Sequence, residues 1–531
     1  MWYLAIVVAA TIVLYYELYI GGAVSPSIIA GYGMTFPFYV YISVVGNAIG
    51  ALGSLAAGLS DRWGRANLVA YGLVVTALLI LIGIPNASNK WSFAILFCII
   101  GMVEGVILVA TPALIRDFSP QLGRASAMGF WTLGPVVGSL VVAVVSSNTV
   151  NHLGAWQDQF IICGIVGLVV GVVALFGLKE LSPRLRDQLM VSIKDRALIE
   201  ARAQGLDVED ALRRPWRQMM HLDIIGSAFA ISVFLLIYYT AVGFFTVYFT
   251  TLHGFSLSKA NSIGDWFWGL DAIALIGIGI ISDRLRVRKP FMVVGGVGSI
   301  VLTIIFLNLG AKTSYATFAV VISILAVFLA IAYAPWMASF TETVEKRNPA
   351  LTATGLAVWG LIIRVVIAVS VLILPSVISS MTPLVTYGTQ AATISATYPQ
   401  QLATLGAIDP GTQAALSANP ADTAAQAKAV GEIATAFKVT PTVATSRLLA
   451  LAAVPKADQA FLAAHGTQVT NAAAAAPGQW KDWWWVCVGG QVLFLPFILV
   501  MAGRWRPRRA REDAEEHDRL IQEELAALGQ S

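Results

Sequence analysis

The sequence predicts an all-α, polytopic membrane protein whose twelve transmembrane helices form two bundles of six. Of its 531 residues, 57% are apolar and only 12% are charged, and its mean hydropathy is +0.75. Soluble domains average roughly 45–50% apolar and 25% charged residues. The charged residues are too few to cover the surfaces of several soluble cores, which argues against a soluble enzyme or regulator. A net charge of +4 likewise gives no overall field that would attract nucleic acid.

Twelve apolar runs are long enough to cross a bilayer. A transmembrane helix needs about 20 apolar residues to span roughly 30 Å of hydrocarbon. Strands of a membrane β-barrel would instead alternate apolar and polar residues over about ten positions, which these continuous runs do not. The predicted spans are 2–24, 36–59, 66–85, 91–115, 127–147, 160–178, 223–250, 258–281, 290–309, 314–339, 351–379 and 483–503.

The placement of Lys and Arg predicts the orientation of these spans. The loops after spans 2, 4, 8 and 10 are rich in basic residues, whereas the short loops on the other side carry only Lys90, Lys259 and Lys312. Cytoplasmic loops carry the excess of positive charge, so both termini are expected in the cytoplasm and the protein in the cell membrane. No basic stretch precedes the apolar run at Met1, so a removable signal peptide fits poorly, and whether the natural start lies upstream stays open. The basic residues of the expected cytoplasmic loops are Arg62, Arg65, Arg116, Arg124, Arg284, Arg286, Arg288, Lys289, Lys346 and Arg347.

An internal repeat divides the chain into two halves. Three short sequences recur after 222 or 223 residues, and six spans fall within that offset. An even number of spans returns the chain to the same side of the membrane, so the halves share one orientation. The repeated pairs are Tyr15-Tyr16 with Tyr238-Tyr239, Ser60-Asp61-Arg62 with Ser282-Asp283-Arg284, and Ala110-Thr111-Pro112 with Tyr333-Ala334-Pro335.

Two long segments lie outside the predicted spans. The hydrophilic segment 179–222 is compatible with a helix on the membrane surface, beginning at Ser182-Pro183, and equally with a solvated linker. The alanine-rich segment 383–479 is compatible with a small helical cap or with disorder. The predicted organisation is an N-terminal bundle (1–178), a cytoplasmic central loop (179–222), helices 7–11 of the C-terminal bundle (223–382), an extracytoplasmic insert (383–479), the last helix (480–503) and a cytoplasmic tail (504–531).

Two loops share a motif of charges and glycines. The loop after span 2 reads Ala57-Gly58-Leu59-Ser60-Asp61-Arg62-Trp63-Gly64-Arg65, and the loop after span 8 reads Gly279-Ile280-Ile281-Ser282-Asp283-Arg284-Leu285-Arg286. Both resemble the signature G-x-L-a-D-R-x-G-R of the major facilitator superfamily, although Ala57 replaces the leading Gly in one copy and Arg286 the second Gly in the other. The alternative interpretation is a positively charged inner loop without further function.

The resemblance implies a fold and a set of gating residues. Spans 1, 2, 4, 5, 7, 8, 10 and 11 would surround a central cavity, and spans 3, 6, 9 and 12 would lie outside it. The motif residues would form a gate between the halves without contacting substrate. The gating candidates are Asp61, Arg62, Gly64, Arg65, Asp283 and Arg284, with Asp117 as a partner for Arg65 and Glu342 in the similar place of the second half.

Glycines four residues apart occur in spans 5 and 2. Gly134-Pro135-Val136-Val137-Gly138 partly resembles the superfamily's antiporter signature G-P-x-x-G-G, but Ser139 stands where the last Gly belongs. The same spacing allows two helices to pack closely, which is the interpretation we prefer here and for Gly46 and Gly50.

Five ionisable residues lie well inside the predicted spans: Glu17, Glu104, Asp265, Asp271 and Arg364. Each costs roughly 2.5–3.5 kcal/mol at a helix centre, so each is expected to face protein or water. All five fall in spans that the resemblance assigns to the cavity. Arg364 keeps its charge, and its planar fork suits a carboxylate or phosphate, which predicts an anion-binding group. The alternative is a structural ion pair with Asp271 or Glu104.

The carboxyl groups of Glu17, Glu104 and Asp271 are candidates for proton coupling, because a desolvated carboxyl group can take up a proton. Substrate contact and structural pairing stay open for each of them. Asp265 lies nearer the outer end of its span and is expected at an interface. Tyrosine hydroxyls, including that of Tyr19, can donate hydrogen bonds into the cavity, although packing is the alternative. The substrate-binding candidates are Arg364, Asp271, Tyr15, Tyr16, Tyr238 and Tyr239.

These features predict a secondary transporter that moves a small organic solute, with an organic anion preferred, by proton-coupled alternating access. A proton-coupled efflux antiporter for drugs or metabolites and a transporter-like solute receptor are the alternatives. No phosphate-binding loop, H-E-x-x-H or G-x-S-x-G occurs, so neither an ATP-driven pump nor an enzyme is expected. No cofactor or metal site is expected, and Cys98, Cys163 and Cys487 are interpreted as core residues. The expected partners are substrate, protons and membrane lipid, without nucleic acid, and the protein is expected to be monomeric.

Overall fold

The computed structural model describes residues 2–55, 64–118, 133–179, 215–348 and 351–509, and five further positions up to Arg519. Within these ranges every regular element is a helix, which confirms the all-α class. The chain divides into two compact units, one made of Met1–Ser379 and Gly478–Ser531 and the other of Ser380–Pro477. Most of the predicted central loop, including its expected surface helix, lies outside the described residues.

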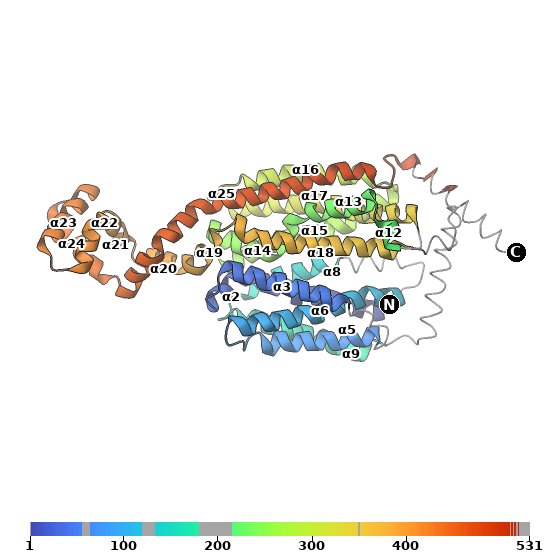
Figure 1. Cartoon of the computed structure of the whole chain (residues 1–531), viewed down its shortest axis with the longest axis horizontal. Helices are drawn as coiled ribbons and strands as arrows, with labels where there is room; N and C mark the ends of the chain where they lie inside the picture. Colours follow the sequence, from blue (N-terminus) through green and yellow to red (C-terminus); the bar gives the residue numbers. More distant parts are fainter. Residues whose placement is uncertain are drawn as a thin grey trace. The chain divides into compact units, whose positions relative to one another are not determined.

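The N-terminal half of the first unit is a group of helices drawn in blue to cyan (Figure 1). Pro26 lies in the first turn of the short second helix, and Gly33 at φ +58° helps the chain turn by 114° into the third. The helices are α1 (Trp2–Ala23), α2 (Ser25–Gly31), α3 (Phe36–Leu55), α5 (Arg65–Leu78) with its π-helical continuation η2 (Leu79–Gly83), α6 (Lys90–Phe118), α8 (Gly134–Thr149) and α9 (Gln157–Gly177).

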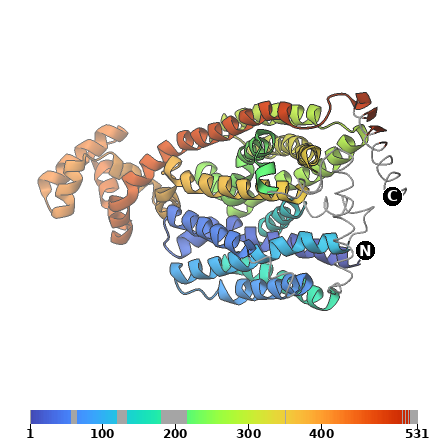
Figure 2. The same cartoon turned by 45° about the vertical axis from the view of Figure 1, so that its right-hand side comes forward.

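The C-terminal half lies beside the N-terminal half in both views of the first unit (Figures 1 and 2). Its helices are separated by local stop and start signals. Gly254, at φ +61°, follows α14, and the side chains of Ser256 and Ser314 cap the helices that come next. The helices are α12 (Pro215–Met219), α13 (Leu222–Phe234), α14 (Leu236–His253), α15 (Leu257–Leu285), α16 (Lys289–Leu307), α17 (Tyr315–Arg347), α18 (Thr352–Val377) and the later part of α25 (Lys456–Val500).

Ten of the described helices are long and apolar enough to cross a membrane, or eleven if the bent pair α2 and α3 is one span. The shorter apolar helix α8 occupies the place of predicted span 5. Each predicted span contains a described helix, but the total of twelve stays a prediction. The predicted boundary between the insert and the last helix falls inside α25. The alanine-rich residues before this boundary favour the helical conformation, so the helix continues from them into the apolar run.

Close helix pairs in the N-terminal half are built on glycine. A Cβ on Gly105 of α6 would overlap the carbonyl oxygen of Gly50 in α3, and one on Gly101 would lie 2.8 Å from the carbonyl oxygen of Gly46. This confirms the packing interpretation for Gly46 and Gly50. In the same way, a Cβ on Gly138 of α8 would lie 2.5 Å from the Cβ of Tyr15 in α1, so this glycine also packs two helices together.

The second unit has a small hydrophobic core of its own. Ile408, Ala429, Ile433 and Ala444 are buried in it, and partly buried residues such as Phe437 surround them. Its helices begin at prolines or behind capping side chains such as Asp409 and Asp422. They are α19 (Met381–Pro383), η5 (Leu384–Gly388), α20 (Thr389–Thr397), α21 (Pro399–Gly406), α22 (Pro410–Ala418), α23 (Thr423–Phe437), α24 (Pro441–Ala450), η6 (Leu451–Ala453) and the beginning of α25.

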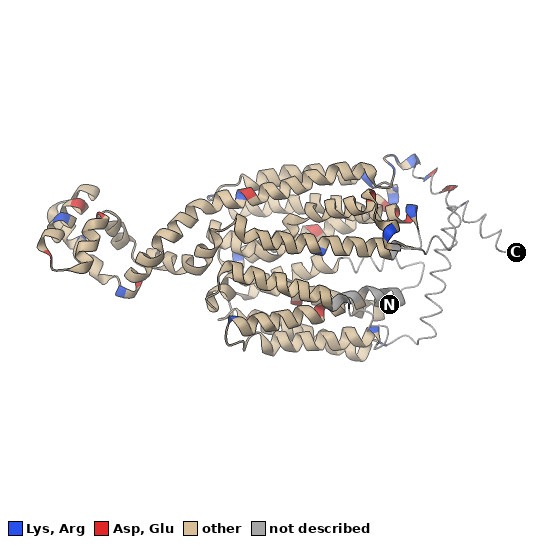
Figure 3. Ribbon diagram, in the orientation of Figure 1, with Lys and Arg blue, Asp and Glu red and all other residues tan. Residues whose placement is uncertain are grey.

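Lys and Arg gather at one end of the first unit, where α1 begins and α25 ends (Figure 3). We call this the basic end. It includes the turn between α15 and α16 and the last residues of α17. The other end of this unit, where α1 ends and α15 begins, is called the opposite end.

Candidate functional site

A cluster of polar side chains lies where the two halves meet. Tyr15 and Tyr19 stand one helical turn apart on α1, with ring centroids 5.6 Å apart. Tyr333 of α17 is an electrostatic neighbour of both and of Asp271, which lies on α15. We call this group the central cluster; its members are Tyr15, Tyr19, Tyr238, Tyr239, Asp271, Tyr333 and Arg364.

Arg364 brings a guanidinium and Asp271 a carboxyl group to the central cluster. The Arg364 guanidinium, on α18, is an electrostatic neighbour of the Tyr15 hydroxyl. Asp271 is fully buried, and its carboxylate lies close to the Tyr238 hydroxyl without hydrogen-bond geometry. Within the described part of the chain, neither Asp271 nor Glu104 has a hydrogen-bond partner for its carboxylate. Neither carboxylate is therefore hydrogen-bonded to Arg364, and the structural ion pair stays an alternative.

Glu17 and Glu104 are electrostatic neighbours inside the N-terminal half, and Glu104 is also an electrostatic neighbour of Tyr19. The Glu17 carboxylate packs against Gly167 of α9, at a point where any Cβ would overlap it. Glu104 and Cys163 are its electrostatic neighbours. Residues two apart on a helix point about 200° apart, so Glu17 leaves α1 on the side opposite Tyr15.

Tyr16 does not join the central cluster. It is fully buried, and its electrostatic neighbour is Cys163 of α9. One residue along a helix turns the side chain by about 100°, which separates Tyr16 from the face shared by Tyr15 and Tyr19. The expected substrate contact by Tyr16 is therefore not supported, whereas Tyr238 and Tyr239 both reach the cluster.

Toward the opposite end, the two halves are in direct contact. The Asn261 amide of α15 donates to the carbonyl oxygen of Ala23 at 3.0 Å, and the Ser147 hydroxyl of α8 donates to Asp265 at 2.9 Å. This places Asp265 at an interface, as expected. At Gly22 a Cβ would overlap the carbonyl oxygen of Val242, so α1 and α14 also meet closely.

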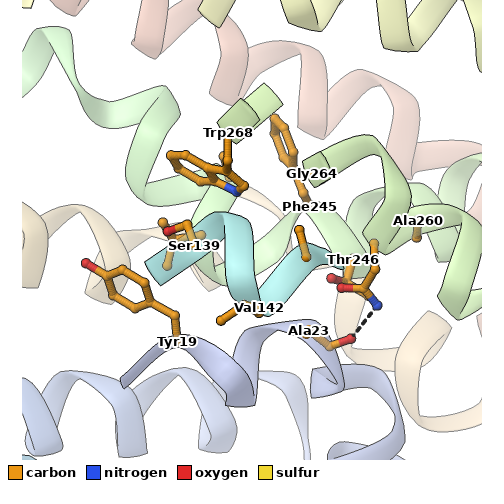
Figure 4. Close-up of a pocket in the computed structure, with 13 residues that line it drawn as sticks. Tyr19, Ala23, Ser139, Val142, Phe245, Thr246, Ala260, Gly264 and Trp268 are labelled. Atoms are coloured by element: carbon orange, nitrogen blue, oxygen red, sulfur yellow. Dashed lines mark hydrogen bonds between the residues drawn. The ribbon is translucent and has the colours of Figure 1, made fainter. Parts of the chain in front are cut away.

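A small pocket lies beneath these contacts (Figure 4). Its volume of about 30 Å³ is too small for a metabolite in this conformation. The Ser139 hydroxyl at its wall has no hydrogen-bond partner among the described residues. Four helices of both halves line it, with Tyr19 and Ala23 from α1, Ser139 and Val142 from α8, Phe245 and Thr246 from α14, and Ala260, Gly264 and Trp268 from α15.

At the basic end, Arg288 joins two carboxylates. Its guanidinium lies 2.6 Å from Asp283 and 3.0 Å from Glu342, and it also donates to the Ser282 hydroxyl at 2.8 Å. Arg284, which was predicted to take part in this gate, is instead exposed. Helix α15 ends at Leu285 and Arg286 adopts a left-handed conformation at φ 55°, which returns the chain across the helix end and brings Arg288 back to Asp283.

The first copy of the motif is only partly described. Gly64 has φ 90° and precedes Arg65, the first residue of α5. The left-handed conformations of Gly64 and Arg286 at equivalent positions explain why the motif favours glycine there. Asp61 and Arg62 lie outside the described residues, as does the side chain of Asp117.

Comparison with known proteins assigns the family. A sequence model described as the Major Facilitator Superfamily matches residues 6–371, which is more than half of the chain. The chain belongs to the major facilitator superfamily. It is therefore an integral membrane transporter rather than an enzyme, with the family's fold. A bacterial homolog of the human lysosomal transporter Spinster, solved in an inward-facing and occupied conformation, has a TM-score of 0.55 at 15% identity, covering 95% of this chain and 98% of that one. A D-xylose-proton symporter has a TM-score of 0.53 at 15% identity, covering 70% of this chain and 89% of that one.

Sequence relatives within the superfamily are distant. Probable anion transporter 3, chloroplastic, of Oryza sativa subsp. japonica is 23% identical over 45% of this chain and 48% of its own length. The hexuronate transporter of Bacillus subtilis is 26% identical over 54% of this chain and 67% of its own length. Multidrug resistance protein MdtG of Escherichia fergusonii is 30% identical over 26% of this chain and 33% of its own length. The chain spans about half or less of the length of most of these relatives.

The sequence analysis did not assign a functional role to two residues of the site, Arg288 and Tyr333. The motif's spacing does not indicate Arg288, because position 65 of the first copy corresponds to Val287 and Arg288 lies one residue beyond it. Tyr333 was used only to align the repeat, although a tyrosine inside an apolar span is itself a signal. Neither the repeat offset nor the composition shows that Tyr333 is an electrostatic neighbour of Tyr15, because the two lie on helices distant in sequence.

Proposed function

We propose that this superfamily member is a proton-coupled secondary transporter that moves a small organic anion across the cell membrane by alternating access. The observation that carries the proposal is the position of Arg364 beside Tyr15 in a cluster to which both halves contribute. A guanidinium keeps its charge at any physiological pH, and tyrosine hydroxyls beside it can donate further hydrogen bonds to a carboxylate. A site shared between the halves can be exposed to either side as they rock.

Two kinds of support favour the anion. Relatives named as an anion transporter and as a hexuronate transporter match this chain over about half of its length. The central cluster also combines the Arg364 guanidinium with tyrosine hydroxyls, which are groups that can donate hydrogen bonds to a carboxylate. We further propose that the basic end faces the cytoplasm, since its loops carry the excess of Lys and Arg, and that the protein acts as a monomer.

Proton coupling is proposed through the buried carboxyl groups. Asp271 lies within the central cluster, so binding of a proton and of substrate there can influence each other directly. Glu17 and Glu104 lie together in the N-terminal half, and Glu104 neighbours Tyr19 of the cluster. The two glutamates can therefore sense substrate through Tyr19 without contacting it.

The decisive experiment measures uptake into proteoliposomes with a panel of solutes under inward and outward proton gradients. Glucuronate and glucose form a matched pair within the panel, because they differ in one carboxylate. We expect Arg364→Ala to lower uptake of the anionic substrate by about 30-fold or more and to leave a neutral solute unaffected. Arg364→Lys keeps the charge and should retain part of the activity. Unchanged anion uptake by Arg364→Ala would contradict the assignment of Arg364 as the anion-binding group.

Coupling is tested by separating exchange from accumulation. Glu17→Gln, Glu104→Gln and Asp271→Asn keep side-chain size but cannot release a proton. At least one of them is expected to exchange substrate across the membrane while failing to accumulate it against a gradient. If all three retain the pH dependence of the parent protein, the coupling group lies elsewhere.

A proton-coupled efflux antiporter for drugs or metabolites is the second candidate. It is supported by the match to MdtG and by the Gly134 to Gly138 sequence in α8. In the same proteoliposomes a symporter accumulates solute when the proton gradient is directed inward, whereas an antiporter accumulates it when the gradient is directed outward. A solute receptor would bind substrate without any net flux.

A further inference from the structure

The backbone of Ala502, just beyond the end of α25, is hydrogen-bonded to two side chains of α17. The Ser339 hydroxyl donates to the Ala502 carbonyl oxygen at 2.9 Å, and the Ala502 amide donates to the Thr343 hydroxyl at 2.8 Å. The Thr343 hydroxyl in turn donates to the Ser339 carbonyl oxygen at 2.6 Å. Both side chains are buried. We call Ser339, Thr343 and Ala502 the C-terminal clasp.

A second contact holds the end of α25 against α16. The last four carbonyl groups of a helix have no partner within it. The Lys289 ammonium, at the start of α16, donates to one of them, the carbonyl oxygen of Leu499, at 3.2 Å. Farther along the same two helices, a Cβ on Gly296 would lie 2.7 Å from the Leu495 side chain, so the helices pack closely. Ala502 therefore has a defined position relative to both α16 and α17.

The next residue, Gly503, lies beside the ion pair between Arg288 and Glu342. A Cβ on Gly503 would lie 3.7 Å from Glu342 Oε2 and 3.9 Å from the Cβ and Cγ of Arg288. The Arg288 Nε donates to the other oxygen of Glu342 at 3.0 Å. Gly503 has φ +104°, which residues with a side chain rarely adopt, so glycine allows the backbone to take this course.

The ion pair with Glu342 is better shielded from water than the pair with Asp283. The Glu342 side chain is 39% exposed and that of Asp283 is 71% exposed, and both bind the same Arg288 guanidinium. Attraction between charges grows as water is excluded, so the Gly503 backbone beside Glu342 strengthens this pair. Ala502 and Gly503 are consecutive, as are Glu342 and Thr343, so release of Ala502 also moves Gly503 away from Glu342.

We propose that Ser339 and Thr343 are positioning residues for a gate formed by Arg288 and Glu342. By fixing Ala502 they keep Gly503 beside the ion pair, so the segment that follows α25 takes part in the opening and closing of the basic end. This inference rests on the predicted gating role of Glu342, and two separate measurements distinguish the clasp from the gate.

The first measurement is the rate at which a water-soluble carbodiimide with glycine ethyl ester modifies Glu342 in the purified full-length protein, determined by peptide mass spectrometry. The variants are Thr343→Val and Ser339→Ala, which each remove one hydroxyl of the clasp, and Thr343→Ser, which keeps it. The matched control is Thr341→Val, because the Thr341 hydroxyl donates to carbonyl oxygens of its own helix α17.

The loss of one hydrogen bond of the clasp is expected to raise the population of released Ala502 about fivefold. Thr343→Val and Ser339→Ala should therefore each speed the modification of Glu342 by about that factor, and Thr343→Ser and Thr341→Val should react as the parent does. Asp283 is the exposed internal reference and should react equally in all variants. Modification of Glu342 at the parent's rate in both Thr343→Val and Ser339→Ala overturns the inference, as does equal acceleration in Thr341→Val.

The second measurement follows the conformational equilibrium and needs no substrate. Ser139→Cys, in a background with Cys98→Ser, reacts with a membrane-impermeant maleimide when the opposite end opens. Arg288→Gln should change this rate, and Thr343→Val should change it in the same direction. The double variant should match Arg288→Gln alone, because the clasp then has no ion pair to position.

Each outcome of this second measurement decides one part of the inference. A rate that shifts in Arg288→Gln but not in Thr343→Val overturns the positioning role, and so do effects that multiply in the double variant. An unchanged rate in Arg288→Gln contradicts the gate and with it the functional role of the clasp, whereas the contact of Gly503 with the ion pair is judged by the carbodiimide rates.

Discussion

The contact between α1 and α14 toward the opposite end makes Gly22→Ala a sharp test of alternating access. In the structure the halves meet there, and an added methyl group at Gly22 overlaps the carbonyl oxygen of Val242. Backbone atoms cannot move aside as a flexible side chain can. The substitution therefore penalises the conformation in which this end is closed and leaves a conformation in which the helices separate there unaffected.

The size of the effect follows from the packing. Inserting a methyl group into a well-packed contact costs about 1–3 kcal/mol. Because every 1.4 kcal/mol changes an equilibrium tenfold, the population open at this end should rise by about 5- to 150-fold. Transport should slow, since each cycle must pass through the closed conformation.

A cysteine in the pocket beneath the contact reports this shift. Ser139→Cys, in a background with Cys98→Ser, should react slowly with a membrane-impermeant maleimide when Gly22 is present and at least about fivefold faster in Gly22→Ala. The matched control is Gly243→Ala on α14, where a Cβ meets nothing within 4 Å. Equal labelling rates in Gly22→Ala, Gly243→Ala and the parent would refute the reasoning.

Three further predictions concern the basic end, the helix packing and the second unit. Arg288→Gln should lower the transport rate by about tenfold, because it removes the ion pairs with Asp283 and Glu342. Arg284→Gln, at an exposed position, should change the rate little. Equal effects of the two variants in an uptake assay would contradict a gating role for Arg288. Gly105→Ala should destabilise the protein by about 1–3 kcal/mol, measured as a lower melting temperature in detergent, because its methyl group meets the backbone of α3. Ile433→Ala should destabilise the second unit by about 2–5 kcal/mol and expose it to limited proteolysis, while Leu449→Ala, at a 71% exposed position, should behave as the parent.

Part of the central cluster was predictable from helical periodicity. Tyr15 and Tyr19 are four residues apart and share a face of α1, whereas Tyr16 and Glu17 point elsewhere. The sequence prediction assigned the whole span to the cavity and therefore included Tyr16 and Glu17, which lie on other faces of α1 and whose roles stay predictions. The gating role of Arg284 stays a prediction, and the structure adds Arg288, which the left-handed Arg286 brings back to Asp283.

The sequence by itself determined the membrane class and the helical nature of the apolar runs. These follow from local rules: apolar runs of sufficient length must become helices in lipid, because every backbone group must be hydrogen-bonded within its own segment. Only the tertiary structure decided which side chains meet across helices, such as Arg288 with Glu342 of α17 and Asn261 of α15 with the carbonyl oxygen of Ala23 in α1. Those contacts depend on how helices distant in sequence rotate and pack, and residue spacing along one helix carries no information about its neighbour.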